Sequence, residues 1–420
     1  MNRYLSLVFF ICLLLIAFLS AFGNNLTALP LAGLVICWFF EGDWKQKLKM
    51  LSGSVWLMLF TSYYILTLIT LTYTRSMHGG LLNIGIQLPI LLLPLVLSTS
   101  ENKLMKTAPK YIFGTLLASS LIILIICFSR ALYKYSLNHD TSEFFYTKLA
   151  GNLHPGFLSM YENFSIILLI YSLCSDSDIL NFRILRSPYL RLFLMFFMFF
   201  FVFFLTSKTG TITCFLTLCS FVIYYLAKMK GKALKALIVL FFAGMVFLIS
   251  HSTVKDRFSR ASSSISNRGI PVPKTSHNAE ESTVLRMEAL KAATEIIKAH
   301  WLLGIGNGSV ENELCRIYEE KGLIYNLGRR VSPHNLYLKV WAENGIFGLL
   351  ALLAMFLAPL YYSIREKKFL IFSFILIMMI NCLTDDIIYL QSGVMFYAFL
   401  NSLLIFVYPK LQKPFSKSSI

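Results

Sequence analysis

The sequence predicts an all-α integral membrane protein with about twelve transmembrane helices and one long outward-facing loop domain that contains helices. Three observations support this class. Hydrophobic residues make up 57% of the 420 residues and charged residues only 14%, whereas a soluble domain carries about 25% charged residues. Apolar runs of about 20 residues, each long enough to cross the hydrocarbon layer, recur along the chain. Basic residues gather in alternate connections between these runs.

Twelve apolar runs are the candidate spans. They cover residues 4–22, 26–40, 51–72, 81–98, 111–128, 157–174, 192–206, 211–227, 236–250, 335–362, 369–386 and 393–408. No small-residue cleavage site follows the first run, so we expect a retained helix and not a cleaved signal peptide. The chain thus divides into helices 1–9 within residues 1–250, a large periplasmic loop at 251–333, and helices 10–12 with a short tail at 334–420.

The distribution of Lys and Arg predicts the orientation. With a cytoplasmic amino terminus, every short connection on the inner side is basic, including the lysines at positions 45, 47 and 49. The short connections on the outer side hold at most one Lys or Arg each. Two longer segments, 129–155 and 251–333, also fall outside. We therefore expect both termini in the cytoplasm and the long loop in the periplasm.

The net charge and the cysteine content limit the binding partners and metals to be expected. The formal net charge of +17 fits this topology and contact with anionic membrane lipids. Nucleic acid is not an expected partner, because the chain has no basic soluble domain to bind it. Of the eight cysteines, only Cys315 stands in a polar stretch, and neither a disulfide framework nor a zinc-binding spacing is present. No metal is expected.

The long loop is expected to begin irregularly and then to form a helix. Residues 259–278 are polar, rich in Ser and interrupted by two prolines. Ser282 or Thr283 suits a helix N-cap, and apolar residues then recur at helical spacing up to Trp301. Arg286 has no acidic residue three or four positions away. Its guanidinium is therefore available for a bidentate contact with phosphate, and a solvated arginine is the alternative.

A glycine-rich stretch, Gly304-Ile305-Gly306-Asn307-Gly308, follows this helix. Such a turn can bring backbone N–H groups close to an anion, or it can simply end the helix. Because no β-strand precedes it, a dinucleotide-binding fold is excluded.

Residues 329–337 end the loop and open the tenth span. Ser332 and Pro333 suit the N-cap and the first helical position, which places His334 in the first turn of the helix. The positive end of a helix disfavours imidazolium, so a neutral His334 can accept a proton as a general base. A lone interfacial histidine often has no function, but this one follows two arginines.

The same span predicts a close helix contact. At 100° per residue, Gly345 and Gly348 fall on the same face of the helix as His334 and let another helix approach closely. Glu343 lies on the opposite face, so we do not expect it to orient His334 directly.

Two further polar sites lie at membrane depth. Lys208 stands in the tight turn 206–210, and the pair Asp385 and Asp386 lies near the outer end of the eleventh span. Ionisable residues in a membrane segment indicate function by default. The alternative is that Lys208 extends to the surface and that one aspartate pairs with a basic loop residue.

Together these stretches resemble the O-antigen ligase and polymerase superfamily of bacterial envelope enzymes. The resemblance covers about residues 200–390 and rests on 207–210, Arg286, 300–308, Pro333-His334-Asn335, 343–348 and 383–385. His154-Pro155, before the sixth span, is a looser similarity. Lys208 occupies the position of an arginine in the family, and Trp301 that of a proline.

The resemblance implies a GT-C-like fold and a metal-independent, inverting glycosyltransferase that needs no cofactor. The donor would be a glycan on undecaprenyl diphosphate, and the acceptor a sugar hydroxyl of lipid A-core, at the periplasmic face of the inner membrane. His334 would be the base, and Arg286 and Lys208 would bind the diphosphate. Further substrate contacts would come from Arg329, Arg330, Asn335 and Asp385.

Within the superfamily, a ligase is favoured by the single long loop late in the chain and by a basic outer surface suited to a phosphorylated core. An O-antigen polymerase, which extends lipid-linked repeats, shares the motifs and is the first alternative. A sugar-lipid flippase or other transporter is the second. Transporters place their sites near the bilayer midplane, whereas here the candidate residues gather in one outer loop.

Overall fold

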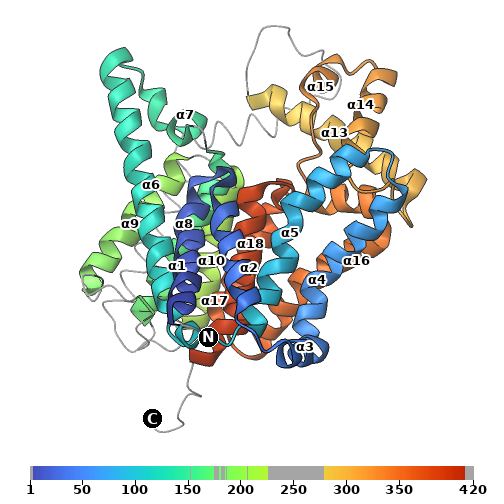
Figure 1. Ribbon diagram of the computed structural model, residues 1–420. Coiled ribbons are helices and arrows are strands. Elements are labelled where there is room, and N and C mark those ends of the chain that lie inside the picture. Colours follow the sequence, from blue (N-terminus) through green and yellow to red (C-terminus); the bar gives the residue numbers. More distant parts are fainter. Residues whose placement is uncertain are drawn as a thin grey trace.

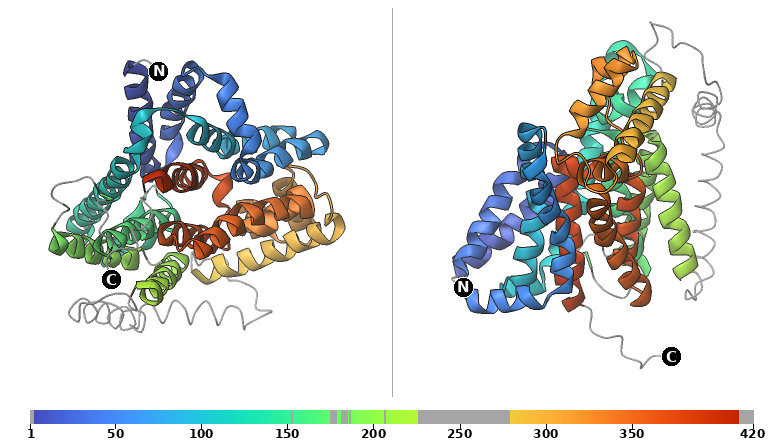
Figure 2. Two further views of the ribbon diagram at one scale, coloured as in Figure 1. Left: turned by 90° about the horizontal axis from the view of Figure 1, so that it is seen from below. Right: turned by 90° about the vertical axis from the view of Figure 1, so that its right-hand side faces the viewer.

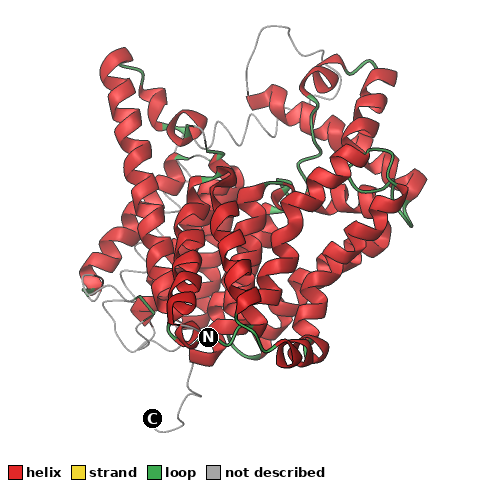
Figure 3. Ribbon diagram, in the orientation of Figure 1, coloured by secondary structure: helices red, strands yellow, loops and turns green. Residues whose placement is uncertain are grey.

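The computed structural model describes residues 3–151, 153–174, 179–180, 185, 187–205, 207–225 and 279–411. Every regular element within these ranges is a helix (Figure 3). The longer helices are α1 (Arg3–Leu19), α2 (Ala28–Phe40), α4 (Val55–Thr70), α5 (Met77–Thr99), α6 (Ala108–Asn138), α8 (Pro155–Cys174), α9 (Pro188–Phe204), α10 (Lys208–Tyr225), α13 (Ala279–His300), α16 (Leu336–Arg365), α17 (Phe369–Asn381) and α18 (Gln391–Ser402). The shorter ones are α3 (Trp44–Gly53), η5 (Thr141–Phe144), α7 (Tyr146–Ala150), α14 (Val310–Glu320), α15 (Ile324–Arg329) and η7 (Ile387–Tyr389).

Most of the predicted spans coincide with apolar helices. Among the described residues, six helices are long and apolar enough to cross a membrane, namely α1, α4, α5, α6, α8 and α16 with their short extensions. Five shorter apolar helices, α2, α9, α10, α17 and α18, coincide with further predicted spans. The predicted span 236–250 and the polar stretch 259–278 lie outside the described residues. The described part of the chain is therefore all-helical, and its apolar helices are those of a multi-pass membrane protein.

The third predicted span begins later than expected. A separate amphipathic helix, α3, precedes it, and Ser54 caps α4 by accepting the Leu57 N–H at 3.3 Å. Lys47 on α3 is buried, because its ammonium donates to the Trp38 carbonyl at 2.6 Å and lies 3.3 Å from a Glu41 carboxylate oxygen. An amphipathic helix of this kind lies along a membrane surface.

Two helices form the centre of the bundle. Every residue of α18 from Gly393 to Ser402 is buried, as is 94% of the apolar window of α8. Seen along the helices, α18 lies among the others (Figure 2, left). α5 packs along α18, and α17 packs along α8.

Two parts project from the bundle at the end opposite to the start of α1 (Figure 1). One is a lobe of α13, α14 and α15, visible above the bundle in Figure 2, right. Its core joins α13 to α14 and to the first turns of α16 through Ala289, Ala292, Ala293, Ile296, Ile297, Ile305, Val310, Leu314, Ile317, Tyr318 and Ala342. The predicted apolar stripe of this helix is confirmed. Its predicted cap is wrong, because α13 begins at Ala279 and so contains Ser282 and Thr283.

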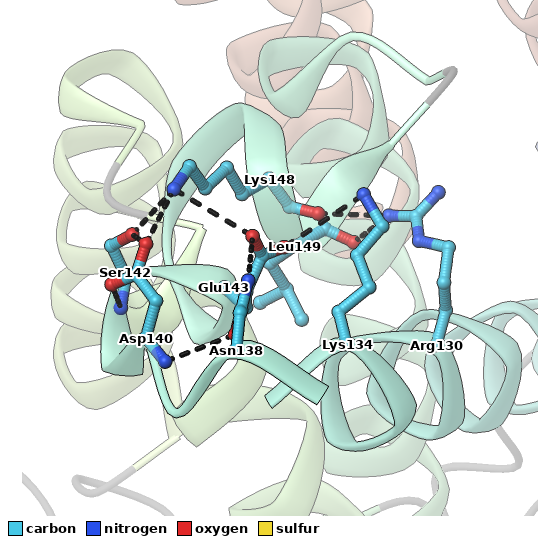
Figure 4. Close-up of polar contacts among 8 residues, drawn as sticks. All are labelled: Arg130, Lys134, Asn138, Asp140, Ser142, Glu143, Lys148 and Leu149. Carbon is cyan, nitrogen blue, oxygen red and sulfur yellow. Dashed lines mark hydrogen bonds and ion pairs between the residues drawn. The ribbon is translucent and has the colours of Figure 1, made fainter. Parts of the chain in front are cut away.

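The other projection is the α6–α7 elbow, formed by the carboxyl end of α6, η5 and α7. α6 has 31 residues, about 46 Å of helix, which exceeds the hydrocarbon layer of about 30 Å. A polar network holds the elbow together (Figure 4). Lys148 lies 2.7 Å from Asp140 and 3.6 Å from Glu143, and Arg130 donates to the carbonyls of Lys148 at 3.0 Å and Leu149 at 2.6 Å. α7 is thereby fixed to α6.

Candidate active site

Three of the motifs singled out in the sequence stand at the starts of helices. His154 directly precedes α8. Ser207 caps α10 by accepting the Gly210 N–H at 3.2 Å. Asn335 caps α16 by accepting the Leu338 N–H at 3.0 Å. Each motif therefore begins a helix whose N–H groups point toward the same end of the bundle.

The turn 382–386, which follows α17, joins these helix starts. Thr384 Oγ1 lies 2.8 Å from Thr209 Oγ1 at the start of α10. The Leu336 N–H, at the start of α16, donates to the Cys382 carbonyl at 2.9 Å. Because the amino terminus of a helix carries a partial positive charge, several of them close together favour an anionic ligand.

A single carboxylate lies between two imidazoles at this place. Asp385 Oδ1 is 3.4 Å from His334 Nδ1, and Asp385 Oδ2 is 3.9 Å from His154 Nδ1. The three side chains keep exposed fractions of 17% for Asp385, 33% for His334 and 45% for His154. The group is thus accessible to a substrate while its members remain in contact with one another.

The Asp385 carboxylate faces Nδ1 of the His334 ring. A carboxylate facing Nδ1 favours the tautomer with the proton on Nδ1, which leaves the Nε2 lone pair free to accept a proton. Glu343 does not contact this ring, because its carboxyl group accepts hydrogen bonds from Tyr389 and Gly308.

The predicted helical position of His334 is wrong. α16 begins at Leu336 with Asn335 as its cap, and His334 lies before it with a φ of +48°. This left-handed conformation costs a residue other than glycine about 1–3 kcal/mol. Ser332, the predicted cap, instead donates a short hydrogen bond to Asp386. The argument from the positive helix end therefore does not apply to His334. The Asp385 carboxylate faces its ring instead.

Arg286 lies on α13 within electrostatic reach of this group. Burial lowers the pKa of the His154 imidazole from its ordinary value, the Asp385 carboxylate opposes that shift, and the positive charge of Arg286 adds to it. In the described part of the chain, no carboxylate lies within ion-pair distance of the Arg286 guanidinium. The absence of local acidic partners, expected from the sequence, thus extends to the folded chain as far as it is described.

The remaining predicted site residues are placed as follows. Lys208 is the first residue of α10, and its side chain lies outside the described atoms. Arg329 ends α15, whereas Arg330 donates to Asn312 Oδ1 at 3.0 Å on α14. Asn335, besides capping α16, donates to the backbone of the turn 382–386. Substrate contacts by these four residues stay predictions.

The glycine-rich stretch contacts a carboxyl group that belongs to the protein itself. Glu343 is buried and accepts hydrogen bonds from the Tyr389 hydroxyl at 2.5 Å and the Gly308 N–H at 3.2 Å. The stretch also ends α13, since the Gly304 N–H donates to the His300 carbonyl at 2.8 Å. The helix-stop alternative is therefore confirmed, and the hydrogen bond to Glu343 ties the lobe to α16.

α16 is not the uninterrupted helix that the face argument assumed. Gly345 has a φ of +64°, which kinks the helix there. The segment that approaches is the turn 301–303 after α13 and not another helix, because a Cβ on Gly345 would lie 2.1 Å from the Leu302 carbonyl oxygen.

Lys339 is a buried residue that the sequence analysis did not single out. Its ammonium lies 3.6 Å from Asp386 and 3.5 Å from Glu311, and 4.1 Å from the centre of the Tyr389 ring. One of the two aspartates is thus paired with a base, as the alternative proposed, although the base belongs to a helix. A lysine four residues into an apolar span is the signal that pointed to it.

The arrangement defines a class: a multi-pass helical membrane protein with a histidine–aspartate site where several of its helices begin. Among the described residues, no group of three or more His, Cys, Asp or Glu side chains is arranged to hold a metal ion. Residues 193–353 match the family model described as O-antigen ligase, which supports the resemblance of this chain to the O-antigen ligase superfamily. The matched segment contains Lys208, Arg286 and His334. A comparison with curated proteins gave no match.

Proposed function

We propose that the protein is an O-antigen ligase, a metal-independent, inverting glycosyltransferase. It transfers O-antigen polysaccharide from undecaprenyl diphosphate to a sugar hydroxyl of lipid A-core and so completes lipopolysaccharide. The observation that carries the proposal is the group of His334, Asp385 and His154. Arg286 lies within electrostatic reach of His154 in this group, and residues 193–353 match the O-antigen ligase model.

The reaction faces the periplasm in this proposal, with both termini in the cytoplasm and the chain in the inner membrane. Two features support this orientation. The basic connection that contains α3 lies at the same end as the start of α1, and the lobe of α13–α15 lies at the opposite end (Figure 1). Basic short connections are typical of the cytoplasmic side.

The chemistry needs one base and one anion-binding group. His334 Nε2 takes the proton of the acceptor hydroxyl, whose oxygen forms a bond to the anomeric carbon. The bond from that carbon to the phosphate oxygen breaks on the opposite face, and its electron pair leaves with the lipid diphosphate. Displacement from the opposite face inverts the anomeric configuration. Asp385 stabilises the imidazolium, and Arg286 neutralises the charge on the leaving diphosphate.

Deletion of the gene tests the proposal. Loss of a ligase leaves bare lipid A-core and polymer stranded on its carrier, which gel analysis of envelope glycolipids detects. Core that bears one repeat would instead identify a polymerase and overturn the ligase assignment.

A second experiment separates an enzyme from a transporter. Purified protein in detergent should join lipid-linked glycan to lipid A-core without a gradient or a vesicle. A protein that moves the lipid-linked glycan across vesicles but forms no new glycosidic bond would be a flippase.

A further inference from the structure

Arg130 on α6 holds α7 and Gly151, which lie before α8, in place. The guanidinium of Arg130 binds two carbonyls of α7, as Figure 4 shows. Gly151 follows with a φ of +66° and packs on that guanidinium so closely that a Cβ would lie 1.3 Å from Arg130 Nη1. Pro155 then fixes the first position of α8. His154 is therefore presented from a restrained backbone.

One hydrogen bond defines the tautomer of His154. Its Nδ1 accepts the Gly156 N–H at 3.3 Å. Asp385 Oδ2, at 3.9 Å from the same nitrogen, lies beyond hydrogen-bond distance. Because burial lowers the pKa of the ring, the imidazole is neutral at pH 7 and carries its proton on Nε2. His154 and His334 thus hold opposite tautomers on either side of one carboxylate.

A neutral donor at this place suits an anionic ligand. The side chain of His154 is 45% exposed, so a ligand can reach Nε2. Arg286 supplies positive charge nearby, and the starts of α8, α10 and α16 add their partial positive charges. A second base would gain nothing here, because the lone pair of Nδ1 is already occupied by the Gly156 N–H.

We infer that His154 contacts the substrate, donating a hydrogen bond from Nε2–H to a phosphate oxygen of the lipid diphosphate, beside Arg286. The identity of this ligand rests on the proposed function. The two imidazoles then have different roles. His334 accepts the proton of the acceptor hydroxyl, and His154 binds the leaving diphosphate.

Two amide variants distinguish donation from a purely structural role. In His154→Gln the amide nitrogen reaches the position of Nε2 and can donate. In His154→Asn the amide oxygen reaches the position of Nδ1 and can still accept the Gly156 N–H, but no donor reaches the ligand. His78→Asn, at an exposed histidine in the first turn of α5, is the matched control.

The measurement is the binding of polyprenyl diphosphate without glycan to the full-length protein in detergent, by calorimetry. We expect His154→Asn to weaken binding about 10- to 100-fold, the range for a hydrogen bond to a charged group, while His154→Gln and His78→Asn stay within a few-fold of the wild type. Equal weakening in both His154 variants with a lowered melting temperature would make His154 a structural residue.

Unchanged binding in His154→Asn, with a wild type that binds the probe and transfers glycan, would overturn this inference alone. A wild type that neither binds the probe nor transfers glycan would overturn the proposed function itself, and the inference with it.

Discussion

At the scale of single residues, His334 combines a strained backbone with contacts that hold its neighbours. Its φ of +48° is restrained on one side by Ser332, which donates to Asp386, and on the other by Asn335, which donates to the Leu383 carbonyl at 3.2 Å. The restraints therefore come from residues 332 and 335 and not from the imidazole. This separates the conformation of the site from the proton chemistry of its ring.

Replacement of His334 should accordingly abolish transfer and leave the fold intact. We expect His334→Asn, which tolerates a left-handed backbone, to lower the rate of glycan transfer about 10²–10⁴-fold at unchanged abundance and melting temperature. In-vitro transfer with matched amounts of protein is the measurement. Near-normal transfer would leave a base-free reaction driven by charge stabilisation alone.

Substitution of Arg286 distinguishes a bidentate contact with phosphate from a general effect of positive charge. Arg286→Lys keeps the positive charge but replaces a forked contact with a single point of contact, so most transfer activity should be lost, about 10-fold or more. Lys298→Arg, on the exposed end of the same helix, should have no effect. Full activity of Arg286→Lys in the same assay would reduce its role to general electrostatics.

At the scale of helices, hydropathy predicted where spans lie but not how they begin and end. The boundary between α3 and α4 depends on Lys47, whose burial against Trp38 and Glu41 no hydropathy average contains. The start of α16 depends on tertiary contacts in the same way. Ser332-Pro333 and Asn335 both suit a helix start, and the bond from Ser332 to Asp386 is what decides between them.

Gly345 provides a stability test at this scale. Gly345→Ala should destabilise the protein by about 3 kcal/mol or more, because it combines a left-handed φ of +64° with an overlap onto the Leu302 carbonyl. Gly85→Ala, on α5 with nothing within 4 Å of the added Cβ, is the control and should be neutral or stabilising. Thermal unfolding in detergent compares them. Equal melting temperatures would mean that α16 is not kinked in this way.

At the scale of the whole molecule, the orientation can be read by labelling. Cysteine at exposed Lys321 in the lobe should react with a membrane-impermeant reagent in intact cells, and cysteine at exposed Lys45 on α3 should not. Lys47 is unsuitable, because its side chain is only 1% exposed. Reaction at position 45 from outside would invert the proposed topology.

Local sequence patterns predicted single residues of the site but not the contacts between them. His334, Arg286 and Asp385 each stood out by charge, position or resemblance. The contact that joins Asp385 to both imidazoles links residues from distant parts of the chain, so no periodicity or spacing contains it. Lys339 could have been found as a lysine in an apolar span, but only the fold shows that Asp386 lies beside it.

The order of the site residues along the chain also determines when the site becomes complete during synthesis. The site takes His154, Arg286, His334 and Asp385 from successive segments, and Asp385 comes after α17. A ribosome delivers them in that order, so a nascent chain holds the base well before it holds the carboxylate that orients it. On the proposed mechanism, fragments released early would be inert. Lipid-linked glycan, which is costly to make, would then be consumed only once nearly the whole protein has been inserted.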